Sequence, residues 1–140
     1  MAITAAICNS YKQEIMQGVH EAADTYKIAL YTSAATLGAS TTAYTATNEV
    51  ANGNGYTTGG ATLTGFTVTI DTNTAVLDFT TDPTWAASTI TARGALIYNS
   101  SQTNKAVCVL DFGADITSTN DTFTVQFPAA TAAAGLVRIV

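Results

Sequence analysis

Charged side chains are scarce in this sequence. Asp, Glu, Lys and Arg make up 11% of its 140 residues, against roughly 25% in an average soluble protein. The 5 Lys and Arg residues stand apart from one another, and the 10 acidic residues give a formal net charge of -5. Without a basic cluster, the chain has no electrostatic basis for binding nucleic acid or anionic lipid. We therefore expect neither nucleic acid nor a membrane among its partners.

Residues that usually carry chemistry are scarce too. His20 is the only histidine, so any triad or metal site that needs imidazole would depend on this residue. A place on the polar face of a helix explains His20 more simply. Cys8 and Cys108 have no metal-ligand spacing around them, and we interpret them as reduced packing thiols, with a disulfide as the alternative. The sequence therefore predicts no enzymatic activity, no cofactor and no metal.

Long apolar runs and targeting signals are missing as well. No stretch approaches the roughly 18 apolar residues of a membrane span. The N-terminus lacks the basic region and the apolar core of a secretion signal, so we expect the protein to remain in the cytoplasm that makes it. Hydrophobic residues nevertheless make up 47% of the chain, which excludes a disordered protein.

The pattern that is present predicts one helix followed by a succession of strands. Ser10 and Gln13 fit a capping box, and apolar residues then recur at helical spacing, which predicts a helix over residues 10–23. Alternating apolar residues predict the strands. The expected fold is mainly β, an antiparallel β-sandwich or jelly roll with one N-terminal helix, in a single domain over residues 1–140. The predicted strands cover residues 26–32, 66–70, 75–80, 88–98, 105–112, 122–127 and 136–140.

Residues 33–60 have no sustained period and contain several glycines, which predicts an extended loop or arm. A loop of this length is unusual in a compact domain and is commonly functional or ordered by a neighbour. Two interpretations stay open, contact with another subunit and a mobile surface loop with short strands. Arg93 is a lone cation in the longest predicted strand. The alternatives for it are a carboxylate partner, a place on a solvated face of the sheet, and a contact with another subunit. The candidates for subunit contact are Tyr44, Glu49, Tyr56 and Arg93.

Two further groups allow a functional and a structural interpretation. Asp111, Asp115, Asn120 and Asp121 surround one predicted loop and could supply oxygen ligands to a cation, although Asp and Asn are also common in turns for conformational reasons. Trp85, the only tryptophan, is either part of the core or a platform for a ligand.

Several segments of the sequence resemble those of a known protein family. The segments YKIALYTSAATLG, TAYTATNEV, GNGYTTGGATLTG, ARGALIYN and KAVCVLDFG resemble those of a family of small virion structural proteins of tailed bacteriophages, and together they cover much of the chain. Within such phages, a short protein of this kind resembles a capsid cement, or decoration, protein. This resemblance implies a β-sandwich or jelly roll without catalytic residues.

The resemblance also implies a place and partners. A cement protein sits on the capsid exterior, clamps neighbouring capsomers of the major capsid protein, and is made in the cytoplasm of the host bacterium. A dimer or trimer of the chain would be the natural unit, because a symmetric oligomer bridges symmetry-related capsomers. The alternative in the same virion is a tail, fibre or head-fibre component that contacts the host. A carbohydrate-binding sandwich is an alternative from another class.

Overall fold

The structure is a computed structural model that describes residues 2–140. The protein is an antiparallel β-sandwich with one short N-terminal α-helix, as the sequence pattern predicted. The elements in chain order are β1 (Ala6–Ile7), α1 (Asn9–Met16), β2 (Tyr26–Tyr31), β3 (Ala61–Thr62), β4 (Phe66–Asp71), β5 (Thr74–Phe79), β6 (Thr84–Ser88), β7 (Thr91–Asn99), the 3-10 helix η1 (Ser100–Gln102), β8 (Lys105–Thr117), β9 (Asp121–Thr124) and β10 (Val137–Ile139).

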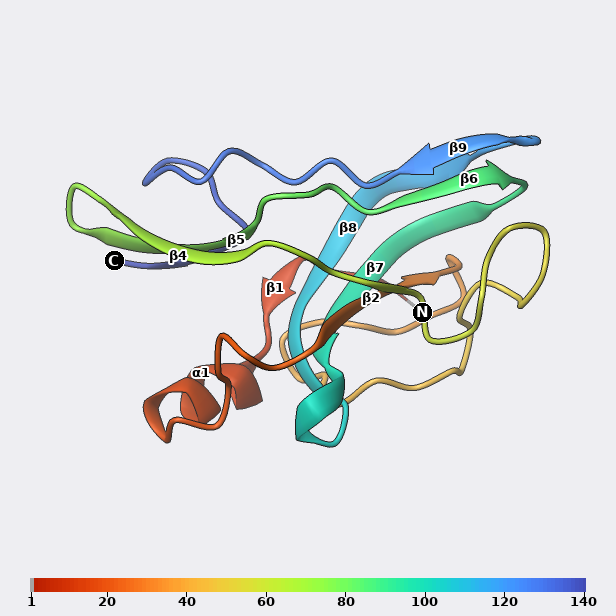
Figure 1. Ribbon diagram of the computed structural model, residues 1–140. Coiled ribbons are helices and arrows are strands. Elements are labelled where there is room, and N and C mark those ends of the chain that lie inside the picture. The colour runs from red at the N-terminus through yellow and green to blue at the C-terminus, as the bar shows by residue number, and fades with distance from the viewer. Residues whose placement is uncertain (1) are drawn as a thin grey trace.

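Two layers of strands enclose the core (Figure 1). One layer is a 5-stranded sheet in the order β1-β8-β7-β2-β3. The other layer is made of a 3-stranded sheet, β10-β5-β4, and a 2-stranded sheet, β6-β9. One continuous cluster of buried apolar residues extends from Ile3 to Val137 and includes residues of both layers and of the 33–60 arm.

The central strands β2 and β7 are buried on both faces, and residues 33–60 explain why. In β2, five of the six residues are buried. The 33–60 arm passes over the face of β2 and β7 that points away from the second layer (Figure 1) and places Ala35, Leu37 and Val50 in the core. Tyr56, near the end of the arm, packs on Trp85 of β6 in the second layer. The arm is therefore ordered by its own domain. Backbone hydrogen bonds, such as that from the N–H of Val50 to the carbonyl of Leu30, and isolated bridges hold the arm on its own domain. Contact of the arm with another subunit stays a prediction.

The helix is shorter than the predicted range of residues 10–23. It ends at Met16 because Gly18 adopts a left-handed conformation (φ 72°). The N–H of Gly18 donates to the carbonyl of Ile15, and the N–H of Val19 donates to the carbonyl of Glu14. This pair of bonds is a Schellman motif. The predicted capping box is also wrong, since Cys8 is the N-cap residue and makes no side-chain cap.

The predicted strand over residues 88–98 is in fact parts of two strands. β6 ends at Ser88 and β7 begins at Thr91. The longest strand is β8, with 13 residues. It continues past the predicted end at residue 112 because its last residues pair with Thr91 and Ala92 of β7, beyond a register shift at which Gly113 takes a positive φ of 81°. Within residues 2–140, no helix has the length and apolar character needed to cross a bilayer.

Candidate interaction surface

Three of the predicted contact residues lie together within the arm. Glu49 accepts hydrogen bonds from the hydroxyl of Tyr56 (2.6 Å) and the N–H of Gly59 (2.7 Å) on Oε1, and from the hydroxyl of Tyr44 (2.7 Å) on Oε2. The Tyr56 hydroxyl also accepts from the N–H of Leu30 in β2 (2.9 Å). Glu49 thus joins two tyrosines and the arm backbone to the sheet.

Other tyrosines anchor the arm in the same way. The hydroxyl of Tyr98 in β7 donates to the carbonyl of Gly59 (2.6 Å), and that of Tyr31 in β2 donates to the carbonyl of Thr45 (2.6 Å). Tyr44 stacks on Tyr98 with ring centroids 4.7 Å apart. Burial, together with the negative charge of Glu49, raises the pKa of Tyr98 to about 12, so the phenol is neutral at physiological pH. These residues tie the arm to its own sheet, and their contact with another subunit stays a prediction.

Arg93 lies apart from this network. Its Nε donates to Oδ1 of Asp111 (3.1 Å), and both side chains are partly exposed. The same carboxylate oxygen accepts from the N–H of Gly113 (2.9 Å). The Gly113 bond and the Arg93 pair lower the pKa of Asp111. The carboxylate partner expected as one alternative is confirmed.

The surroundings of His20 bear on catalysis. Asn99 Nδ2 donates to His20 Nδ1 (3.1 Å), an assignment supported by Asn99 Oδ1, which accepts from the N–H of Ser101. His20 Nε2 therefore carries the proton and donates to Glu14 Oε2 (2.9 Å). Both ring nitrogens are engaged and the side chain is 1% exposed. His20 also lines the second hollow described below, and either nitrogen would have to give up its protein partner before it exchanged a proton with a substrate.

The sequence predicted that His20 lies on the polar face of a helix. This prediction is wrong, because the helix ends at Met16. Trp85 belongs to the core and packs on Phe123 with ring centroids 6.0 Å apart. The two cysteines are buried free thiols, as predicted. Asp111, Asp115 and Asp121 form no group able to hold a metal ion, and no such group of three or more His, Cys, Asp or Glu exists among residues 2–140.

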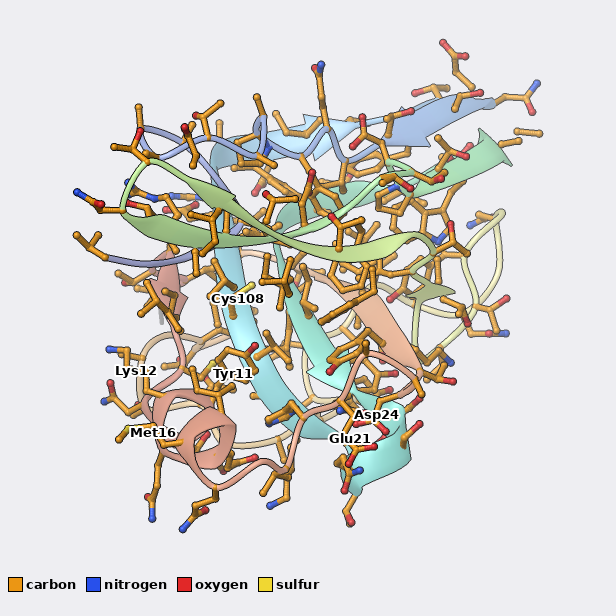
Figure 2. The ribbon with its side chains drawn as sticks, turned by 60° about the vertical axis from the view of Figure 1, so that its left-hand side comes forward. Tyr11, Lys12, Met16, Glu21, Asp24 and Cys108 are labelled. Atoms are coloured by element: carbon orange, nitrogen blue, oxygen red, sulfur yellow. The ribbon has the colours of Figure 1, made fainter. Side chains whose placement is uncertain are left out.

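The exposed apolar surface gathers in one region that the sequence analysis did not single out. A hollow of about 380 Å³ lies between α1 and the C-terminal strand β10, and a second one of about 200 Å³ adjoins it under the β4–β5 hairpin. We call the first the α1–β10 groove. Figure 2 shows α1, with Tyr11 and Met16, below the hairpin. The groove is lined by Ile7, Tyr11, Lys12, Ile15, Met16, Val137, Arg138, Ile139 and Val140.

The two hollows account for four of the six large apolar side chains that are exposed among residues 2–140. Met16 is 89% exposed and Ile139 is 52% exposed in the groove, and Val68 is 57% exposed under the hairpin. Ile70, 72% exposed on β4, and Ile116, 46% exposed on β8, are the members of this group that line neither hollow. Single exposed apolar residues are normal, whereas a gathering of them marks an interaction surface.

The charged side chains that line the two hollows are all positive. Lys12 and Arg138 line the groove, and no Asp or Glu lines either hollow within residues 2–140. In a chain with 10 acidic and 5 basic residues, two cations beside an apolar groove favour an apolar occupant flanked by carboxylates.

Comparisons of the chain with models of protein families, with curated proteins and with solved structures find no match. The fold and the surface described above are therefore the basis for any assignment of function, together with the resemblance in sequence wording.

Proposed function

We propose that this chain is a structural component of a tailed-phage particle, a cement protein that binds the outside of the major capsid protein shell and stabilises it. The observation that carries the proposal is the apolar α1–β10 groove, which gives the molecule a surface suited to a lasting protein partner. The resemblance in sequence wording supplies the phage context. The role is not enzymatic, and the engagement of both His20 nitrogens supports that part of the proposal.

The groove offers enough apolar area for a useful contact. Burying a large aliphatic side chain contributes about 1.5–3 kcal/mol when it was fully exposed before, and Met16 is 89% exposed. A protein that binds only the assembled shell stabilises that shell by its binding free energy. Many symmetric copies add their contributions over the lattice, so a modest contact per copy is sufficient.

The shell partner would present an apolar segment with acidic neighbours. The apolar part fills the groove between α1 and β10, and the carboxylates lie opposite Lys12 and Arg138 at its rim. Exposed ion pairs contribute little to affinity but fix orientation. Salt is therefore expected to weaken binding only slightly, because the apolar contact supplies most of the affinity.

Particles stripped of this protein test the proposal. Adding the purified chain back should raise the temperature at which the particles release DNA. Met16→Glu should bind stripped particles at least about tenfold more weakly, because a carboxylate replaces an apolar contact in the groove. Ile116→Glu is the matched control, an exposed apolar residue outside the groove. Particles equally heat-stable with and without the protein would contradict the cement role, and binding along the tail alone would favour the tail or fibre alternative.

A further inference from the structure

The β4–β5 hairpin carries an apolar face that the domain leaves partly uncovered. Val68 pairs with Leu77, and Ile70 pairs with Ala75, across the antiparallel ladder. Residues directly opposite each other in a ladder point to the same face. Leu77 is buried, whereas Val68 is 57% and Ile70 is 72% exposed. The core face of the hairpin therefore extends past the rest of the domain, as the projecting hairpin shows in Figure 1.

Strand β4 is also an unprotected edge. It ends the sheet order β10-β5-β4, and in the part of the chain that the structure describes, its backbone makes ladder hydrogen bonds with β5 alone. The register with β5 runs from Phe66 to Asp71 without a bulge. Natural edge strands are commonly protected by Lys, Pro, a bulge or a covering loop, and β4 has no Lys or Pro. Such an edge is suited to accept another strand.

We infer that β4 pairs in antiparallel fashion with β4 of a second copy of this chain, forming a twofold dimer with one continuous six-stranded sheet. A strand that meets its own copy closes the edge on both sides, because the interface is isologous. The two core faces then lie on the same side of the joined sheet, and the exposed residues of each hairpin cover those of the other. This inference is independent of the proposed function.

The sequence of β4 is complementary to itself. The side-chain alternation allows only registers that place apolar residues opposite apolar residues. In one of these, Thr69 lies at the twofold axis and Val68 faces Ile70 of the partner subunit. Asp71, the only charged residue of β4, then lies opposite a threonine rather than opposite a second carboxylate. Although the chain has a net charge of -5, no like charges lie opposite each other at this interface.

The length of β4 limits the strength of the dimer. Six residues span about 20 Å of strand, so the interface lies at the small end of specific protein contacts. We therefore expect a reversible dimer that forms in the micromolar to millimolar range of protein concentration.

Sedimentation equilibrium of the purified chain tests the pairing. The wild-type mass should rise toward that of a dimer with increasing concentration, up to millimolar protein. Ile70→Lys should weaken the dimer at least about a hundredfold, because each dimer would bury two unpaired ammonium groups. Ile116→Lys makes the same change at an exposed isoleucine of β8 and should dimerise like the wild type. Thermal melts of both variants show whether each is folded.

Cross-linking gives a second readout that does not depend on affinity. Thr69→Cys should form an intermolecular disulfide under mild oxidation in the register with Thr69 at the axis, and Val68→Cys should do so in the register displaced by one residue pair. The native cysteines are buried and do not compete. Ile116→Cys is the control and should not cross-link. A wild type that stays monomeric at millimolar concentration, an Ile70→Lys variant that dimerises normally, or a trimer would overturn the inference.

Discussion

Removing the Glu49 carboxylate is expected to release the arm from its own sheet. The side chain accepts three hydrogen bonds, from the hydroxyls of Tyr44 and Tyr56 and from the N–H of Gly59. Tyr44 is only partly buried and can turn to water, but Tyr56 and Gly59 are buried. In Glu49→Ala, these two buried donors lose their acceptor.

The expected loss follows from those two donors. A buried donor left without a partner costs about 1–3 kcal/mol, so Glu49→Ala, which leaves two, should lower the free energy of unfolding by about 2–6 kcal/mol. This is a large share of the 5–15 kcal/mol of a typical domain. Glu49→Gln keeps a carbonyl oxygen where Oε1 lies and should lose about 1 kcal/mol, which makes it the matched control.

Urea unfolding measures the loss, and limited proteolysis shows where it acts. We expect Glu49→Ala to be cut faster within residues 33–60, because the arm opens locally before the sandwich unfolds. The wild type should resist cutting there even in the isolated protein. A Glu49→Ala variant within about 0.5 kcal/mol of the wild type, the scatter of neutral surface changes, would refute the idea that this carboxylate anchors the arm.

Two further predictions follow from the helix end and from the tyrosines. Gly18→Ala should lower the free energy of unfolding by about 1 kcal/mol, because the left-handed conformation is unfavourable for alanine; the space around the site is open, so no clash adds to this loss. Gly18→Asn should lower it less. Equal urea midpoints for the wild type and both variants would contradict this prediction. Burial raises the pKa of Tyr11 and Tyr98 to about 12. A raised folded pKa gives stability that is present below pH about 10, the pKa of free tyrosine, and is lost as the pH rises toward 12. Absorbance titration should show these phenols ionising late or together with unfolding, and titration at the ordinary pKa in the folded protein would argue against their burial.

Much of the fold could be predicted from local pattern. The alternation in β2, β4 and β5 identified these strands closely, because apolar residues recur at every second position and a turn or loop follows each strand. The helix end could also have been predicted, since Gly18 is the kind of residue that terminates a helix. The spacing of the apolar residues beyond Gly18 predicts a continued helix, but the left-handed conformation of this glycine ends the helix before them.

The candidate surface depends on information that local pattern lacks. The alternation correctly placed Phe66, Val68 and Ile70 on one face, but it does not show how far the opposite layer extends. Only the three-dimensional arrangement shows that Val68 and Ile70 lie past that layer. The arm is a similar case. The hydrogen bonds from Tyr44 and Tyr56 to Glu49 depend on how the whole loop is folded, and no regular spacing in the sequence predicts them.

An image reconstruction of the phage particle tests the central proposal most directly. The proposal predicts density for this β-sandwich on the outside of the shell, with the α1–β10 groove against the major capsid protein and Met16 within the contact. Density on the tail or fibres, or a shell contact that leaves the groove facing solvent, would contradict it.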